Sequence, residues 1–128
     1  MSSKIGIRLV LGVGLSILAA SSFADLTLAR NKACMSCHSL DKKVVGPSFQ
    51  DIAIKYQSNP NAVKIGVTAI TKGVKGNWGT VAMPPNKMAT AAEAETLAKW
   101  VMSLKTKDAV KSALKPQLDG KFKEVKHK

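Results

Sequence analysis

The sequence is poor in cysteine, in aromatic residues and in acids. Two cysteines among 128 residues cannot form a disulfide-dense scaffold, and the length leaves room for one small domain. The longest apolar run, Leu9 to Ala20, is too short to predict a membrane span. Eight acidic residues stand against 20 basic ones, a net charge of +12, while 45% apolar and 22% charged content is ordinary for a globular protein. This composition excludes a disordered acidic chain and a polytopic membrane protein.

The N-terminal residues have the pattern of a secretory signal peptide. Lys4 and Arg8 precede the apolar run, and small residues stand before a cut after Ala24. An uncleaved anchor is the alternative, but the run is shorter than the ~20 residues that cross a bilayer. We therefore expect residues 1–24 to be cleaved, and a mature chain with a formal charge of +10 that works in the periplasm.

Four segments of the remaining chain are amphipathic at helical spacing, and no segment alternates with the period of a strand. The expected helices begin at about Asp25, after Ser48, at Asn59-Pro60 and at Thr90. The last of them opens with a capping box, in which the Thr90 hydroxyl and the Glu93 carboxylate satisfy free backbone N–H groups. Its apolar face is formed by Leu97, Trp100, Val101 and Leu104. The sequence therefore predicts an all-α domain.

Two segments depart from the helical pattern. The stretch from Gly73 to residue 89 contains three glycines and two prolines, and so long an irregular stretch in a small domain usually has a functional reason. The last 23 residues contain seven lysines and three acids. Their amphipathic part is a two-turn piece made of Ala109, Val110, Ala113 and Leu114. We interpret 106–128 as a basic and flexible tail, and 25–105 as the domain.

The most informative motif is CMSCH at residues 34–38. This spacing is typical of covalent haem attachment, in which two thiols add to the haem vinyl groups and the adjacent imidazole binds the iron. A thioredoxin-type dithiol is an alternative, but it would follow a strand, and none is predicted here. A structural zinc site needs four ligands, and beyond these three only His127 remains, in the tail. We expect one haem on Cys34 and Cys37, with His38 as an iron ligand.

A six-coordinate haem iron needs a second axial ligand, and Met83 stands in front of two prolines in the irregular stretch. Prolines fix the backbone φ angle, so this thioether can be held against the iron with little further loss of entropy. Met88 is the nearest competitor, but nothing rigid surrounds it. Met35 and Met102 are better interpreted as packing residues, and His127 would make a bis-histidine haem. Met83 is therefore the expected ligand.

Together these motifs resemble the small bacterial class I cytochromes c of the c-551 type. The shared elements are CMSCH at 34–38, Gly46-Pro47, Lys72-Gly73, Trp78-Gly79, MPPN at 83–86 and LAKWV at 97–101. The resemblance covers about residues 25–105. It implies a cytochrome c fold of about four helices around one covalent haem, with the N- and C-terminal helices crossing. It also implies His38 and Met83 as axial ligands.

The resemblance implies supporting roles for three further residues. Pro47 would accept the Nδ1–H of His38 through its carbonyl, Trp78 would lie near a haem propionate, and Asn86 would brace the methionine loop. Relatives often carry an arginine on the third helix that meets a propionate, and Ala69 occupies that place here. Lys72 is the candidate substitute.

The function that this resemblance implies is one-electron transfer in the periplasm, without enzymatic activity, because both axial positions are filled by protein. The basic charge predicts redox partners with acidic docking surfaces, and we expect a monomer that binds no nucleic acid and does not insert into the membrane after signal cleavage. The tail is a candidate docking element, dispensable for the fold. The alternative function is a haem enzyme or gas-binding cytochrome with a displaceable sixth ligand. Such a protein would lack the thioether–iron absorption band at ~695 nm.

Overall fold

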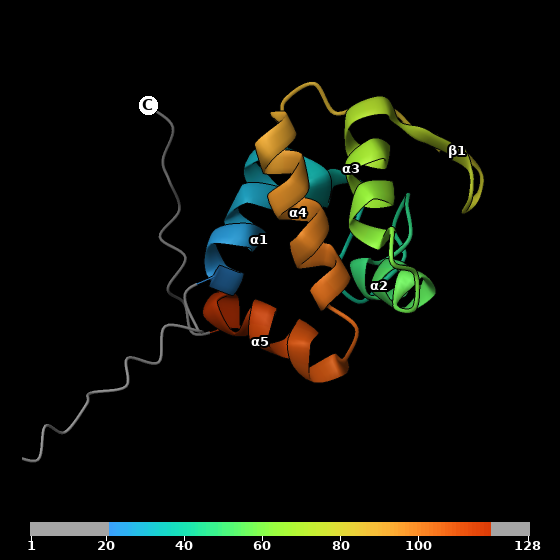
Figure 1. Ribbon diagram of the computed structural model, residues 1–128. Coiled ribbons are helices and arrows are strands. Elements are labelled where there is room, and N and C mark those ends of the chain that lie inside the picture. Colours follow the sequence, from blue (N-terminus) through green and yellow to red (C-terminus); the bar gives the residue numbers. More distant parts are fainter. Residues whose placement is uncertain (1–20, 119–128) are drawn as a thin grey trace, which may run out of the picture.

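The computed structural model describes residues 21–118, which form mostly helices (Figure 1). The helices are α1 (Ser21–Asn31), α2 (Phe49–Tyr56), α3 (Ala62–Lys72), α4 (Ala91–Ser103) and α5 (Lys107–Leu118), with a 3₁₀ turn at Cys34–Ser36. The predicted mainly helical class is confirmed. Most of the predicted signal peptide and His127 lie outside the described residues. Within 21–118, no helix is long and apolar enough to cross a membrane.

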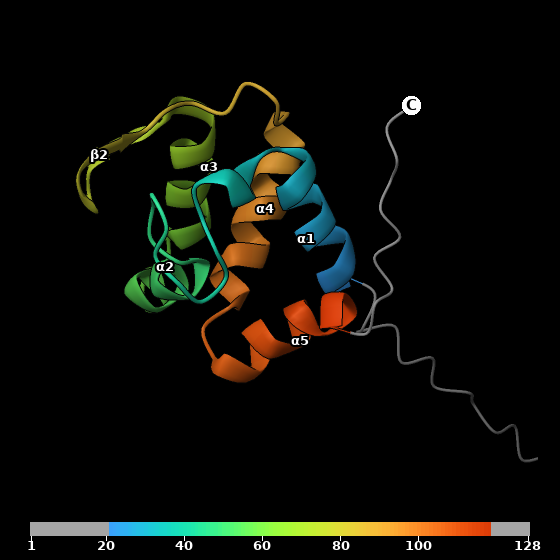
Figure 2. The ribbon, with the colours of Figure 1, turned by 180° about the vertical axis from the view of Figure 1, so that it is seen from behind.

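The stretch predicted to be irregular contains a short antiparallel hairpin. It consists of β1 (Val74–Gly76) and β2 (Gly79–Met83), with Val74 opposite Met83 and Gly76 opposite Gly79. Figures 1 and 2 show the hairpin extending away from the helices, beside α3. The hairpin was not predicted, because neither strand is long enough to show an alternating pattern.

Local capping signals set two of the helix starts where the sequence predicted them. At α2, the Ser48 hydroxyl accepts the backbone N–H of Asp51 at 3.0 Å. At α4, the Thr90 hydroxyl accepts the N–H of Glu93 at 3.2 Å, and the Glu93 carboxylate accepts the N–H of Thr90 at 2.9 Å. The predicted capping box is therefore confirmed.

The third helix begins later than expected. Instead of starting at Pro60, α3 begins at Ala62, because the Asn59 side chain accepts the backbone N–H of Asn61 at 2.8 Å and holds a turn there. Its predicted end at Gly73 is confirmed, and this glycine has a φ of 78°, which a residue with a side chain rarely adopts.

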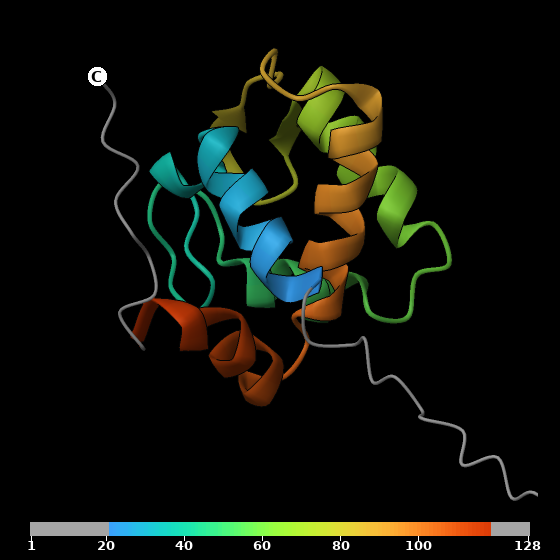
Figure 3. The same cartoon turned by 90° about the vertical axis from the view of Figure 1, so that its left-hand side faces the viewer.

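Helix α4 is the centre of the packing, and it contacts α1, α2 and α3. Its predicted apolar face is buried: Leu97, Trp100, Val101 and Leu104. The first and last helices of the predicted domain, α1 and α4, are in contact (Figure 3). Between α3 and α4 the fit is close, since a Cβ added at Gly66 would lie 2.9 Å from the Ala98 Cβ. Helices α3 and α4 can therefore lie in direct contact at this position.

Beyond Lys105 the structure differs from the predicted tail. Helix α5 packs against α1 (Figure 3), and Val110 and Ala113 belong to the core, with exposed fractions of 4% and 1%. The Thr106 hydroxyl accepts the N–H of Ala109 at 3.1 Å and caps this helix. The two apolar turns are recognisable in the sequence, but the surrounding lysines favoured a solvated tail, and the cap formed by Thr106 was not predicted. At least the first half of the predicted tail is thus part of the packed fold.

Candidate cofactor site

A cavity of about 770 Å³ opens between α3, α4, the hairpin and the chain after the 3₁₀ turn. Both cysteines, His38, Trp78 and Met83 line it, so the fold brings together the candidates from 34–38 and from 78–83. Its apolar walls include Ile65, Ile70, Leu97 and Val101. The volume lies within the range of roughly 300–1,000 Å³ that is typical of ligand and cofactor sites.

The two cysteines lie at a tight turn and are both free thiols. Cys34 is half-buried and Cys37 is exposed. The N–H groups of Cys37 and His38 both donate to the Cys34 carbonyl, at 3.3 and 3.1 Å, which closes the turn. Burial raises the pKa of the Cys34 thiol, and a backbone hydrogen bond offsets this only in part. The turn thus presents two sulfur atoms to one cavity.

Backbone strain marks the entry to this turn. Ala33 has a φ of 58°, in the left-handed region that costs an ordinary residue about 1–2 kcal/mol. It is the one non-glycine residue with a positive φ in the part of the chain that the structure describes. Such strain tends to occur where function requires a particular geometry.

The His38 ring is fixed from three sides. It is 8% exposed, its Nδ1 lies 2.7 Å from the Pro47 carbonyl oxygen, and it stacks on Phe49 with ring centroids 5.2 Å apart. A Cβ added at Gly46 would lie 2.5 Å from the His38 Cε1, so only glycine leaves room for the ring. Because a carbonyl oxygen can only accept, Nδ1 carries the proton and Nε2 keeps its lone pair for a metal. This contact is the one that the resemblance implied for Pro47.

Met83 ends β2 at a place where the chain passes close to the end of α3. A Cβ added at Gly73 would lie 2.6 Å from the Met83 carbonyl oxygen and 3.0 Å from the Pro85 Cδ. The methionine segment can therefore lie against α3 only because residue 73 has no side chain. Met83 itself is half-buried at the cavity.

Asn86 ties the chain after Met83 to two helices. Its backbone N–H donates to the Ile70 carbonyl at 2.7 Å, and its side-chain amide donates to the Lys32 carbonyl at 2.7 Å. The amide oxygen also accepts the N–H of Met88 at 2.9 Å. These bonds give a physical basis for the bracing role that the resemblance implied for Asn86.

The other methionines differ in their position relative to the cavity. Met88 is 57% exposed and does not line the cavity, while Met35 packs against the core. Met102 does line it, from α4, and its Cε would lie 3.5 Å from a Cβ at Gly66, so it packs between α3 and α4. Met83 and Met102 are therefore the methionines that could reach a group in the cavity.

Trp78 lies at the turn of the hairpin and is held there by Lys55. The Lys55 Nζ lies 4.2 Å from the centroid of the indole ring and donates to the Asn77 carbonyl at 2.7 Å. A cation over an aromatic face stabilises both side chains. Trp78 is thus placed at the edge of the cavity by an interaction that the sequence analysis did not predict.

The lysines that line the cavity are not the one that was expected there. Lys72, the candidate substitute for the missing arginine, does not line the cavity, although Ala69 does. Lys43 and Lys64 are the charged side chains that line it within the described residues.

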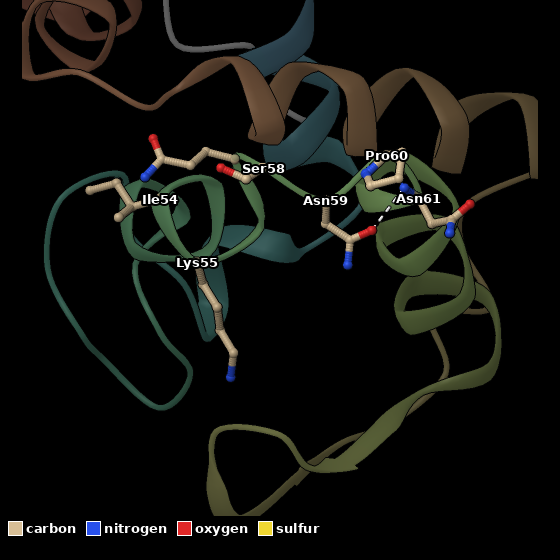
Figure 4. Close-up of a pocket in the computed structure, with 7 residues that line it drawn as sticks. Ile54, Lys55, Ser58, Asn59, Pro60 and Asn61 are labelled. Carbon is tan, nitrogen blue, oxygen red and sulfur yellow. Dashed lines mark hydrogen bonds between the residues drawn. The ribbon is translucent and has the colours of Figure 1, made fainter.

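A second, open hollow of about 510 Å³ lies outside this site, at residues 54–61 between α2 and α3 (Figure 4). It shares Asn59 and Asn61 with the main cavity. Lys55 is one of the residues that line this hollow (Figure 4), and its ammonium group reaches the Asn77 carbonyl of the hairpin.

The main cavity suits a haem better than a bare metal ion. Its lining combines two adjacent thiols, an imidazole with a fixed tautomer and mostly apolar walls, which match the vinyl groups, the iron and the porphyrin face. No group of three or more His, Cys, Asp or Glu side chains among residues 21–118 could hold a metal ion by itself.

The chain is similar to proteins of one known family. The family model for cytochrome c matches residues 27–105. Cytochrome c-551 of Pseudomonas denitrificans is 49% identical over 78 residues, which cover 61% of this chain and 94% of that protein. Cytochrome c-552 of Hydrogenobacter thermophilus is 47% identical over 88 residues, covering 69% of this chain and 89% of that protein. The crystal structure of wild-type cytochrome c552 from Nitrosomonas europaea superposes with a TM-score of 0.60 at 39% identity, covering 62% of this chain and 98% of that one. The chain therefore belongs to the cytochrome c family, as an electron-carrying class I monohaem cytochrome of the c-551 type with one covalently attached haem.

Proposed function

We propose that this cytochrome is a periplasmic electron carrier, with thioether bonds at Cys34 and Cys37 and with His38 and Met83 as axial ligands. The observation that carries the proposal is the single cavity that both thiols, the fixed imidazole and the methionine segment line. When bound, the haem supplies a one-electron ferrous–ferric couple. Two protein ligands leave no open coordination position for a substrate, which favours a carrier over an enzyme.

His38 would bind the iron through Nε2. Its Nδ1–H donates to the Pro47 carbonyl at 2.7 Å, which orients the ring and makes Nε2 a stronger donor. Gly46 and Phe49 hold the ring from either side, so it has little freedom to move when the charge of the site changes. A ligand that keeps its position in both oxidation states suits rapid electron transfer.

Met83 is favoured over Met102 as the second axial ligand because its segment is fixed and is not needed elsewhere. The backbone of Met83 and Pro85 lies against Gly73, and Asn86 fixes the chain that follows, whereas Met102 packs between α3 and α4. A soft thioether stabilises ferrous iron, and the apolar walls exclude water and disfavour the extra positive charge of ferric iron. We therefore expect a positive midpoint potential.

The experiment that tests this ligand set compares three alanine variants of the purified holoprotein. Met83→Ala should abolish the thioether–iron band, admit CO or cyanide, and lower the potential by more than ~100 mV. Met88→Ala, the exposed control, should change none of these properties. Loss of the band in Met102→Ala but not in Met83→Ala would overturn the assignment. Ready binding of CO by the unaltered protein would instead support a gas-binding cytochrome.

The proposed partners are redox proteins that present acidic surface around their electron port. The exposed lysines of α5 repeat at every fourth residue, at 107, 111 and 115, and Lys42 and Lys43 flank the exposed Val44 and Val45 near the site. Opposite charges steer encounter over about a Debye length, ~10 Å at 0.1 M salt. The bimolecular rate with an acidic acceptor should therefore fall as salt rises, and a rate independent of salt would contradict this proposal.

The proposed location depends on the N-terminal segment. Cleavage after Ala24 would leave α1 starting at Asp25, and it would keep the buried residues Leu26 and Ala29. Protein sequencing of the exported holoprotein should therefore begin at Asp25. A chain that retains the apolar segment would point to an anchored protein.

A further inference from the structure

The end of the cavity that is lined by the end of α2, the start of α3 and the hairpin turn is polar. The polar or amphipathic side chains that line the cavity there are Tyr56, Asn59, Asn61, Lys64, Asn77 and Trp78. Among the described residues, no carboxylate lines any part of the cavity. The positive charge of Lys64 is therefore not balanced by an acid of the lining.

Two donors at this end have no acceptor within residues 21–118. The side-chain Oδ1 of Asn59 accepts the backbone N–H of Asn61 at 2.8 Å, the dashed line in Figure 4, and the Asn59 Nδ2 hydrogens have no partner among the described residues. Within residues 21–118, Lys64 takes part in no ion pair and no hydrogen bond. By contrast, Lys55 is already engaged by the Asn77 carbonyl and the Trp78 ring.

We propose that Lys64 and Asn59 bind the propionate carboxylates of the haem, an inference that rests on the proposed function. A haem carries two carboxylates on one edge, and a partly buried carboxylate needs donors that compensate for its lost hydration. The polar end of the cavity offers a cation and an amide, whereas the walls around Leu97 and Val101 offer neither. Lys64 thus fills the role for which Lys72 was expected, from the first turn of α3 instead of the last.

Lys64 is favoured over Lys43 as the propionate-binding lysine because of the residues around each of them. Lys43 also lines the cavity, but it belongs to the loop next to the attachment motif, where Val44 and Val45 are exposed. Lys64 is accompanied by the amides of Asn59 and Asn61. A lysine is a point charge without the planar fork of arginine, so a second donor such as Asn59 helps to orient the carboxylate.

The test measures the midpoint potential of the holoprotein from pH 4 to 9 in Lys64→Gln and in a matched control, Lys72→Gln. Both variants remove one positive charge from α3, but only Lys64 lines the cavity. The midpoint potential should change over the pH range in which a propionate gains or loses its proton, because the charge of the propionate affects the nearby iron. A nearby cation lowers the pKa of a carboxylate, so this pH range should move upward by ~1 unit in Lys64→Gln. The control should keep the wild-type range, and Lys64→Arg should restore it.

A second variant addresses the amide. Asn59→Asp keeps the oxygen that accepts the Asn61 N–H but replaces two donors with a negative charge, so the transition should again move upward. Lys43, Lys55, Tyr56 and His38 are the other titratable groups around the cavity, and all remain in every variant. They cannot produce a difference between Lys64→Gln and Lys72→Gln.

The outcomes separate this inference from the proposed function. Equal pH profiles for Lys64→Gln and Lys72→Gln, while the thioether–iron band and the reversible couple are intact, would overturn the role of Lys64 alone. If the unaltered protein lacked the band and the couple, the proposed ligand set would fail instead. The inference is supported if the pH range over which the midpoint potential changes moves upward in Lys64→Gln and Asn59→Asp but not in Lys72→Gln.

Discussion

Val110→Ala tests whether α5 is part of the folded domain. Val110 is 4% exposed and lies in the same core cluster as Leu26 and Leu104. The transfer free energy lost with its methyl groups is about 1.5 kcal/mol, at ~0.8 kcal/mol per buried methylene, and the cavity left behind adds up to ~1 kcal/mol. Alanine is the better helix former by about 0.5 kcal/mol, which offsets part of this loss. The expected decrease in the free energy of unfolding is about 1–2 kcal/mol.

The assay is thermal unfolding of the mature holoprotein, followed by far-ultraviolet circular dichroism. In a domain of this size 1 kcal/mol corresponds to about 4–8 °C, so Val110→Ala should lower Tm by about 5–15 °C. Lys111→Ala changes the next residue of the same helix, which is exposed, and should leave Tm nearly unchanged. Neither variant should alter the visible spectrum. Equal Tm values for the two variants would refute the packing of α5 and restore the interpretation as a solvated tail.

Three further predictions concern the attachment motif, the ring of His38 and the cap of α4. Serine in place of Cys34 or Cys37 should lower the holoprotein yield, and haem that resists acid acetone in the double variant would contradict covalent attachment. Gly46→Ala should cost about 1–3 kcal/mol of unfolding free energy by overpacking against the His38 ring, as measured in guanidinium; wild-type stability would show that the ring can move aside. Hydrogen bonds from the Thr90 backbone N–H and from Lys32 lower the pKa of Glu93 below its usual 4.5, so the ionised carboxylate stabilises the folded state. Glu93→Gln removes this charge and should therefore destabilise the protein at pH 7. The ionised carboxylate stabilises the fold above pH 4.5, and this contribution is lost as the pH falls through the lowered pKa, so the difference should shrink in acid; a constant difference would argue against this.

The features that could be predicted from the sequence depend on short-range signals. The Thr90–Glu93 capping box and the start of a helix after Ser48 could be predicted because the hydrogen bonds that set them lie within three residues along the chain. The attachment motif is equally local, since its members lie within one turn. Such signals need no knowledge of the fold.

The features that the sequence analysis missed depend on contacts between distant segments. The hairpin is held by the approach of Gly73 to Met83 and by Lys55, which reaches Asn77 from α2. Lys64 was not predicted at the cavity, because the face of α3 that lines it is set by the packing of this helix in the fold. Helix α5 buries mainly small side chains, so its apolar face is weak in the sequence, although the cap at residue 106 was a local signal that could have been found.

Lys32 joins three parts of the molecule that are far apart in the sequence. Its carbonyl accepts the Asn86 amide of the methionine segment, and its ammonium group pairs with Glu93 at the start of α4 at 3.0 Å. The proposed ligand Met83 is therefore fastened to the joint between the first helix and the last helix of the domain. Displacing the segment by local opening would break contacts that also hold the two helices together. Loss of the axial thioether should consequently coincide with unfolding of the whole domain, without a folded intermediate in which the sixth position is open.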